Sequence, residues 1–349
     1  MISKDEFIAQ LDRATSAMQG LPVSSALLRQ LSDGLKKGEP PWWKGVQKAW
    51  ESRRFVAWTE AWGLFLTAVH YDVLGDAKST LAAYFPSCGG TDEADPSTVF
   101  ARYLEELPRE FFDQLRTGQR RVFVPQRAPV WLLPAATYFQ RRGLPYYVVE
   151  INAGAGLNLA ADLLYPQKGF DSELIAARIG LDAAPLQLED SGHRRWLTAA
   201  LMPEEIGDIK ELDRAMDAVS QRQGKEANFI QLAACPAEKA PGFIGKNIPA
   251  DDPDVGIFVF NMGVTVRMSE GDYQKFRARM TQELKAWGDR ALWLEVENVR
   301  GETYSTTYQA LLHKPVDGAF QDMIMLLFDV GTRRVASDAA QLEKFLTPR

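Results

Sequence analysis

Residues 146–159 follow one another as a strand, a glycine turn and the start of a helix, and this order constrains the fold most. The aromatic and β-branched residues from Tyr146 to Ile151 predict a buried strand. The small residues at 152–156 predict a tight turn, and Leu157 opens a helical pattern. Such a turn between a strand and a helix N-terminus forms a cradle for a nucleotide-like ligand, because bare backbone can approach it closely.

The chain after residue 119 alternates short apolar strands with amphipathic helices, which is typical of a parallel α/β sheet. Further strands are predicted at 229–233, 255–261 and 291–296, and helices at 203–219 and from Ser269 to Trp287. No clear strand is predicted between Phe170 and Asp190. Residues 323–329 and 333–336 flank the turn Val330-Gly331-Thr332 and predict a closing antiparallel hairpin.

The first 119 residues lack such strands and predict helices, at 46–69, 76–84 and 97–115 with a break at Pro108. Five of the nine tryptophans fall between Trp42 and Trp62, which predicts the aromatic core of a helical subdomain. An aromatic wall over a ligand is the alternative. We therefore expect a helical cap or lid at 1–119 and a Rossmann-like α/β domain at 120–349. Methyltransferase-type sheets insert an antiparallel last strand, so the closing hairpin favours that type.

Composition excludes several classes of function. A net charge of −6 and an isoelectric point near 5.4 argue against a general nucleic-acid binder. Cys88 and Cys235 are the only cysteines, and no His-Glu-x-x-His spacing occurs, so we expect neither a disulfide framework nor a metal site. No apolar run is long enough for a membrane span and the N-terminus is polar, which predicts a cytoplasmic protein without a membrane partner. The oligomeric state stays open.

The glycine turn resembles the cofactor motif of class I S-adenosylmethionine methyltransferases, an acid and one spacer followed by Gly-x-Gly-x-Gly. Glu150 matches the acid, Asn152 stands where the first glycine belongs, and Gly154 and Gly156 are in place. The cofactor expected here is S-adenosylmethionine, lined also by Ala153 and Ala155. Glu150 would hold its amino end, and Asn158 would donate to its carboxylate from the helix N-terminus. A tight turn without a ligand is the alternative.

A nucleoside cofactor also needs an acid for its ribose hydroxyls, at the end of the next strand about twenty residues on. Asp171 and Asp182 are the candidates, and each has a solvated surface acid as its alternative interpretation. A dinucleotide cofactor would need a third glycine near Leu159, where none occurs.

Two further strand ends carry polar residues that face the ligand crevice of an open α/β sheet. Asn261 closes the apolar run 255–260 and is a candidate for orienting a substrate, or for capping its own loop. Glu295 and Glu297 lie on one side of the following strand, and neighbouring carboxylates can raise one pKa and create a general base. We expect Glu297 to be that base. His313 is expected in a loop before Pro315.

Three segments resemble the bacterial family known as domain of unknown function 2332, over roughly residues 120–340. That family shows Glu-Ile-Gly-Ala-Ser-Ala-Gly-Leu-Asn-Leu at its glycine turn, then a Gly-Leu-Asp-x-x-Pro-Leu element and an Arg-Arg-Trp-Leu element. The matching residues are Glu150, Ala153, Gly156, Leu157, Asn158, Gly180, Leu181, Asp182, Pro185, Leu186, Arg194, Arg195, Trp196 and Leu197. The resemblance implies a methyltransferase-like Rossmann fold and no particular reaction.

The chain departs from this family pattern at several positions. Asn152 replaces a glycine, Gly154 replaces a serine, and Asn261 stands where histidine is frequent. The strand near Leu232 ends in Ala-Ala-Cys where the family tends to show Gly-Asp, and methyltransferases often hold adenine through an acid there. The leading hypothesis is a methyltransferase-like enzyme acting on a small molecule. A non-catalytic binding or scaffold protein and an NAD(P)-dependent oxidoreductase are the alternatives.

Overall fold

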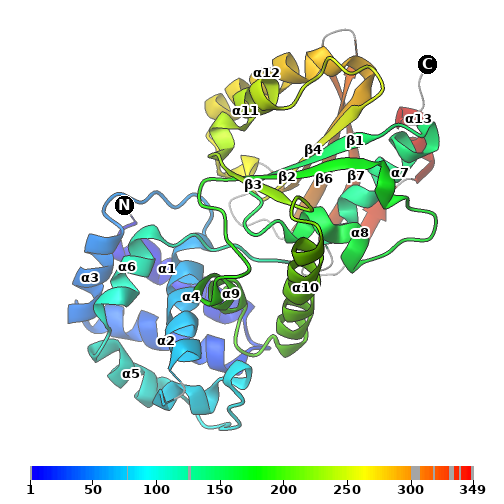
Figure 1. Cartoon of the computed structure of the whole chain (residues 1–349). Coiled ribbons are helices and arrows are strands. Elements are labelled where there is room, and N and C mark those ends of the chain that lie inside the picture. Colours follow the sequence, from blue (N-terminus) through cyan, green and yellow to red (C-terminus); the bar gives the residue numbers. More distant parts are fainter. Residues whose placement is uncertain are drawn as a thin grey trace. The chain divides into compact units, whose positions relative to one another are not determined.

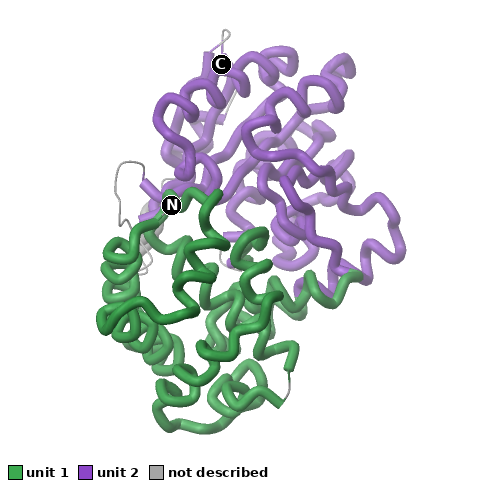
Figure 2. Tube along the Cα trace, turned by 90° about the vertical axis from the view of Figure 1, so that its left-hand side faces the viewer, with its two compact units in different colours: residues 1–123, 189–214 green, residues 124–188, 215–349 purple. Residues whose placement is uncertain are grey.

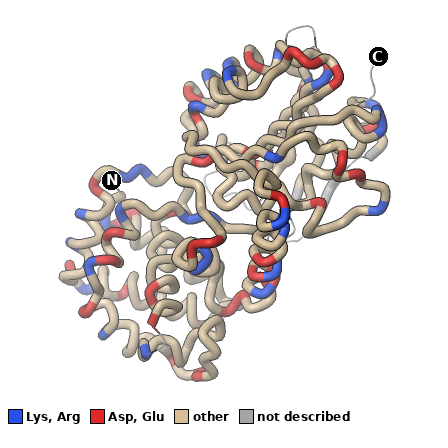
Figure 3. The backbone as a smooth tube through the Cα atoms, viewed as in Figure 1, with Lys and Arg blue, Asp and Glu red and all other residues tan. Residues whose placement is uncertain are grey.

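The structure is a computed structural model and describes residues 2–76, 78–124, 127–299, 307–316, 319–329, 334–337 and 339–346. It divides into two compact units, one of residues 1–123 and 189–214 and one of residues 124–188 and 215–349 (Figure 2). We call them unit 1 and unit 2. The division differs from the expected break after residue 119 because residues 189–214 return to the helical unit. Helix α10 (Ile206–Lys225) carries the chain from unit 1 into unit 2, and both acidic and basic residues are spread along it (Figure 3).

Unit 1 is helical, as predicted, and its helices enclose an aromatic core. Its elements are α1 (Lys4–Ala17), α2 (Pro22–Lys37), α3 (Pro41–Ala49), α4 (Glu60–Gly75), α5 (Ser97–Glu105), α6 (Arg109–Thr117), α9 (Ser191–Ala199) and the 3-10 turns η1 (Thr80–Tyr84) and η2 (Pro86–Cys88). Trp43 and Trp50 are fully buried, and the Trp43 ring stacks on Phe7 with 5.4 Å between ring centroids. Trp42 and Trp62 are also buried, which confirms the packing interpretation of this tryptophan cluster.

The prediction of a single helix at 46–69 is wrong, because α3 ends at Ala49 and α4 begins at Glu60. The carboxylate of Glu60 accepts hydrogen bonds from the amides of Val56 and Ala57, at 2.6 and 3.2 Å. These bonds satisfy amides that a continuous helix would use internally, so the segment turns and α4 begins anew. The helix predicted at 76–84 is likewise reduced to the short turn η1. The predicted break at Pro108 is confirmed by α5 and α6.

Unit 2 is built on a sheet that has eight strands within the described residues, in the order β3-β2-β1-β4-β5-β6-β7-β8. The strands are β1 (Tyr146–Ile151), β2 (Ile175–Asp182), β3 (Gln231–Ala234), β4 (Gly256–Met262), β5 (Ala291–Asn298), β6 (Thr307–Val316), β7 (Ala319–Asp329) and β8 (Arg334–Ser337). The first five in this order pair in parallel and the last three in antiparallel fashion. The Rossmann-like α/β fold with antiparallel final strands is therefore confirmed.

The closing hairpin is confirmed as β7 and β8, although its turn residues lie outside the described residues. Two strands were missed. β2 falls in the segment 170–190, and β6 contains His313, which was expected in a loop. Both strands carry buried charged or polar residues, so neither shows the continuous apolar run that identifies a strand in the interior of a parallel sheet.

Helices cover both faces of the sheet (Figure 1). The helices of unit 2, besides its part of α10, are α7 (Leu132–Tyr138), α8 (Ala161–Leu164), α11 (Ala240–Asn247), α12 (Glu270–Leu284) and α13 (Ala339–Leu346). α11 and α12 pack on one face over apolar residues of the sheet such as Val149, Val259 and Trp293. On the other face the Trp131 ring stacks on Phe260 at 5.9 Å between centroids. β1 and β4 are neighbours from which the strand order runs outward in opposite directions, so the crevice between their carboxyl ends is the topological switch point.

Candidate functional site

The glycine turn lies at the carboxyl end of β1 and adopts the left-handed backbone that its glycines predict. Gly154 and Gly156 have φ of 59° and 74°. Asn152 has φ of 70°, and asparagine visits this region more readily than other non-glycine residues. Asn152 therefore adopts the left-handed backbone that a glycine at this position would adopt most easily.

The amides of this turn bind acceptors within the chain. The amides of Asn152 and Ala153 both donate to the carbonyl of Leu181, at 2.6 and 3.1 Å. The Gly154 amide donates to Oδ2 of Asp182 at 2.9 Å, and the Gly156 amide donates to the carbonyl of Ala153 at 2.8 Å. The end of β2 thus braces the turn, through both its main chain and its terminal carboxylate.

Acids end the two neighbouring strands β1 and β2, beside the turn. Glu150 and Asp182 are each 1% exposed. Oε1 of Glu150 accepts from Nδ2 of Asn158 at 2.7 Å, which joins two residues that the sequence assigned to the cofactor. Oδ1 of Asp182 accepts from the amide of Ala184 at 2.9 Å. Asp171 precedes β2 in an exposed segment, so Asp182 is the acid at the carboxyl edge of the sheet.

Gly156 faces the body of the sheet. A Cβ atom on Gly156 would lie 2.9 Å from Cγ2 of Ile230, just before β3. A Cβ atom on Gly180 of β2 would lie 2.5 Å from Cδ2 of Leu232 and 2.9 Å from Cβ of Ala153. These two glycines therefore allow the turn to pack closely on β2 and β3, the role of the third glycine in nucleotide-binding turns.

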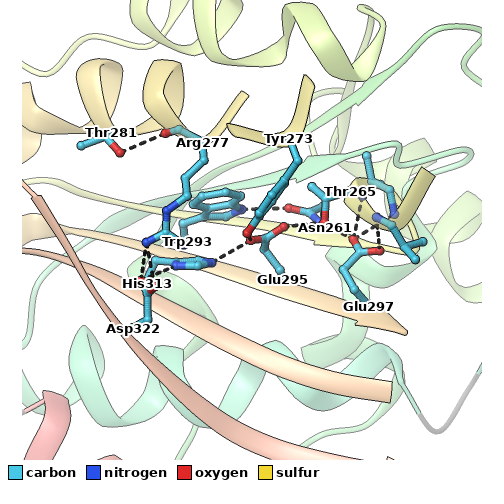
Figure 4. Close-up of polar contacts among 12 residues, drawn as sticks. Asn261, Thr265, Tyr273, Arg277, Thr281, Trp293, Glu295, Glu297, His313 and Asp322 are labelled. Carbon is cyan, nitrogen blue, oxygen red and sulfur yellow. Dashed lines mark hydrogen bonds and ion pairs between the residues drawn. The ribbon is translucent and has the colours of Figure 1, made fainter. Parts of the chain in front are cut away.

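A second group of polar residues lies at the ends of β4 and β5, where it forms a buried chain of hydrogen bonds (Figure 4). Nδ2 of Asn261 donates to Oε1 of Glu297 at 2.6 Å, and its Oδ1 accepts from Nε1 of Trp293 at 2.8 Å. The side chain of Asn261 is fully buried and uses both ends of its amide within the protein. The structure thus brings the two predicted catalytic residues together, with Asn261 in a position to orient Glu297.

The carboxylate of Glu297 also binds three consecutive backbone amides. Those of Val264 and Thr265 donate to Oε1 at 2.9 and 3.1 Å, and that of Val266 donates to Oε2 at 3.2 Å. Burial, together with the nearby charge of Glu295, raises the pKa of Glu297 to about 7, although these amides act in the opposite direction. A carboxyl group with a pKa near neutrality can accept and return a proton at physiological pH.

Glu295 is held by three other side chains (Figure 4). Its Oε1 accepts from the hydroxyl of Tyr273 and lies 2.8 Å from Nε2 of His313, and its Oε2 accepts from the hydroxyl of Thr265 at 2.6 Å. Burial opposes ionisation of Glu295, but the hydrogen bond and charge of His313 outweigh it and lower the pKa of Glu295. Burial and Glu295 raise the pKa of Tyr273, which therefore stays protonated as a donor.

His313 links Glu295 to an ion pair on β7 and α12. Its Nδ1 lies 2.8 Å from Oδ1 of Asp322, whose two oxygens accept from the guanidinium of Arg277 at 2.9 and 2.7 Å. Burial disfavours the charged imidazole, but hydrogen bonds to Asp322 and Glu295 outweigh it and raise the pKa of His313. The His313 ring also stacks on Trp293 with 4.3 Å between centroids. Charge thus alternates along Arg277, Asp322, His313 and Glu295.

A small pocket opens beside this chain of residues. It contains about 270 Å³ of empty space, including the part open to solvent. Its lining consists of Thr265, Val266, Tyr273, Glu295, Glu297, Asn298, Gln309 and Leu311. Much of this volume is open solvent, and the enclosed part is only large enough for a small polar group, so the pocket suits the end of a ligand.

The two groups occupy the same edge of the sheet but opposite faces. Ile151 of β1 pairs with Asn261 of β4, which pairs with Glu295 of β5, so these side chains point to the face covered by α12. Glu150 pairs with Phe260 and points to the other face. A ligand that reaches both groups must therefore cross the edge of the sheet at the switch point.

Comparison with known families gives one match. A family model described as "Uncharacterized protein conserved in bacteria (DUF2332)" matches residues 11–169 and 164–321. The chain belongs to this family. The match extends through the helical N-terminal region, beyond the part that the sequence motifs covered. No curated protein matches the chain.

The sequence motifs that resemble the DUF2332 family lie in different units of the structure. The Gly-Leu-Asp element is the end of β2 and braces the glycine turn through Asp182. The Arg-Arg-Trp-Leu element lies in α9 of unit 1, where the Arg195 guanidinium lies 4.0 Å from the centre of the Tyr71 ring. Nε1 of Trp196 donates to the carbonyl of Gln119. This element therefore stabilises the helical unit.

Sequence reasoning missed five residues of the polar chain: Thr265, Tyr273, Arg277, His313 and Asp322. Tyr273 lies within the helix predicted from Ser269 to Trp287. The signal available for the others was weak, since each is a single polar residue without a spaced partner. In the described part of the chain, no group of three or more His, Cys, Asp or Glu residues could hold a metal ion. No described helix combines the length and apolar character that crossing a membrane requires.

Proposed function

We propose that unit 2 is an S-adenosylmethionine-dependent, methyltransferase-like enzyme that acts on a small molecule. The observation that carries this proposal is the contact between Asp182 and Gly154. An acid that ends β2 lies against the glycine turn that follows β1, whose own last residues include Glu150. Class I methyltransferases hold the ribose through an acid at the end of their second strand, beside the glycine turn.

The residues at this edge fit two parts of the cofactor. Asp182 would accept from the ribose hydroxyls, and Glu150 would accept from the amino end, with Asn158 beside it. The turn 152–156 would line the nucleoside with backbone. At the end of β3, Ala234 and Cys235 stand where many methyltransferases have an acid, so adenine would be held by apolar contact alone. When bound, the cofactor supplies the methyl group.

The chain itself would supply orientation and a proton acceptor. Methyl transfer depends mainly on in-line placement of the reacting groups, so few catalytic side chains are needed. We assign Glu297 as the base, because its pKa of about 7 suits that task. Asn261 is assigned as a positioning residue, because its buried amide holds Glu297 rather than facing the pocket.

A non-catalytic role on the same fold is the second candidate, and one observation favours it. The amides of Asn152, Ala153, Gly154 and Gly156 all bind acceptors inside the chain. A turn that satisfies its own amides offers a ligand fewer donors. An NAD(P)-dependent oxidoreductase is a third candidate, and Leu159 stands where its dinucleotide turn would need a glycine.

Calorimetric titration of the full chain with S-adenosylhomocysteine and, separately, NADPH tests these candidates. The proposal predicts that S-adenosylhomocysteine binds. Its affinity should be at least tenfold weaker in Asp182→Asn and unchanged in Asp171→Asn. Asp171 is the matched control, because it is an exposed acid just before the same strand. Glu150→Gln provides a second variant if Asp182→Asn lowers the unfolding temperature of the protein too far. No heat with either compound would favour the non-catalytic role, and binding of NADPH alone would favour an oxidoreductase.

A further inference from the structure

The pocket beside Glu295 is lined mainly by hydrogen-bond acceptors. The hydroxyls of Tyr273 and Thr265 both donate to Glu295, so their oxygens can only accept from a ligand (Figure 4). The carboxylates of Glu295 and Glu297 accept by nature, and Oε2 of each receives one hydrogen bond in the contacts described above. A ligand that fits this lining must bring donors.

The charge around the pocket points to the same class of ligand. Among the described residues of the polar chain, the cations are Arg277 and protonated His313, and the carboxylates are Asp322, Glu295 and Glu297. Arg277 and His313 balance Asp322 and Glu295 through direct contacts. Among the described residues, the hydrogen bonds to Glu297 come from amides, those of Asn261 and of the backbone at 264–266. Once Glu297 ionises, the described residues of the polar chain therefore carry three negative charges and two positive charges.

The remaining lining is apolar or neutral. Leu311 and Val266 contribute apolar surface, and Gln309 and Asn298 contribute amides that can donate or accept. This combination suits a short aliphatic chain with a charged head. An ammonium group has three donors and one positive charge, and an alcohol has one donor and no charge.

We propose that this pocket binds the ammonium end of a small aliphatic amine, with Glu295 and Glu297 as its charge partners and Tyr273 and Thr265 as further acceptors. Assigning that amine as the methyl acceptor rests on the proposed function. Binding of the amine does not, because the pocket lies on the face of the sheet opposite Glu150.

Three compounds of equal chain length and different charge test this proposal: n-butylamine, n-butanol and butyrate. Each is titrated to 50 mM into the full chain at pH 8 and constant ionic strength, and the unfolding temperature is recorded. A ligand of the native state raises this temperature in a saturable manner. We expect saturable stabilisation by butylamine alone. Equal stabilisation by butanol, or stabilisation by butyrate, would overturn the charge argument.

Variants then localise the effect. Glu295→Gln should weaken the apparent affinity for butylamine at least tenfold, and Tyr273→Phe should weaken it several-fold. Tyr273→Phe removes one oxygen from a half-buried position, so it keeps the proposal testable if Glu295→Gln does not fold. Glu173→Gln, an exposed acid elsewhere in unit 2, should bind as the wild type does. Unchanged affinity in both pocket variants would refute the site.

The outcome is independent of the cofactor. If the protein binds butylamine but not S-adenosylhomocysteine, the amine pocket is supported and the methyltransferase proposal is refuted. If the protein binds S-adenosylhomocysteine but does not discriminate butylamine from butanol, the methyltransferase proposal stands and the amine pocket is refuted.

Discussion

Nε2 of His313 lies 2.8 Å from Oε1 of Glu295, and both side chains are almost completely buried. The two residues come from antiparallel neighbours, β6 and β5, and Asp322 of β7 holds the other nitrogen of the ring. One imidazole thus joins three adjacent strands below the pocket. Removing it would leave a buried carboxylate without its charged partner.

We predict that His313→Leu lowers the free energy of unfolding by about 3 to 5 kcal/mol, because breaking a buried pair strands the remaining charge. Arg141→Gln is the matched control, since Arg141 forms an exposed ion pair with Glu343. Its cost should stay below about 1 kcal/mol. Urea denaturation at pH 7 measures both. Equal losses would show that the buried contact contributes no more than a surface pair.

The raised pKa of Glu297 predicts a pH effect of defined sign. Its ordinary value is 4.5 and its value in the native state is about 7, so the native state binds more protons between these limits. The contribution of Glu297 is therefore present at low pH and is lost as pH rises through 7. The stability difference between wild type and Glu297→Gln should shift by about 2 to 3 kcal/mol against the wild type from pH 5 to pH 8. Urea denaturation at both pH values measures it, with Glu173→Gln as the parallel control. A constant difference would mean that Glu297 titrates normally.

Gly156 should tolerate substitution less well than another glycine with similar backbone. Gly156→Ala places a Cβ atom at a φ of 74° and 2.9 Å from Cγ2 of Ile230. Gly143→Ala meets no atom within 4 Å at a φ of 59°, so it carries the backbone cost alone. We expect about 1 to 2 kcal/mol for Gly143→Ala and about 1 to 3 kcal/mol more for Gly156→Ala. Thermal unfolding compares the two. If they cost the same, the turn does not pack tightly on β3.

His70 predicts acid sensitivity in unit 1. Burial lowers the pKa of His70 to about 4, while its Nδ1 contacts the carbonyl of Leu201 and its Nε2 contacts the hydroxyl of Ser87. The neutral ring is therefore the native form, and the unfolded chain binds the additional proton between pH 6.5 and 4. Stability should fall by about 3 kcal/mol over that interval, and this fall should be absent in His70→Gln. NMR titration of the His70 ring checks the cause directly. A ring that titrates near pH 6.5 in the folded protein would contradict it.

Sequence periodicity predicted the elements whose side chains are almost all apolar. β1, β4 and β5 are buried runs, and α12 has Phe276, Met280 and Leu284 on its inner face, so each pattern depends on residues close together in the chain. β2 was not predicted because Arg178 interrupts its apolar run. The buried guanidinium of Arg178 donates two hydrogen bonds to Asp162, at 2.9 and 2.8 Å, and one to the carbonyl of Leu159 at 2.8 Å.

Some residues of the candidate site could be predicted from the sequence, and others could not. Glu150, the glycine turn, Asn261 and Glu297 were proposed as site residues from their positions at strand ends. His313, Asp322 and Tyr273 were not, because their partners come from other strands and a helix, and one polar residue in a sequence does not reveal its partner.

The sequence by itself thus determined the apolar strands β1, β4 and β5, the helical N-terminal region and the glycine turn, since these follow from local apolar patterns and backbone freedom. Only the tertiary structure decided that residues 189–214 return to unit 1, that Asp182 braces the turn, and that Glu295 meets His313. Those contacts join residues far apart in the chain, and their energies depend on burial, which exists only after the chain has folded.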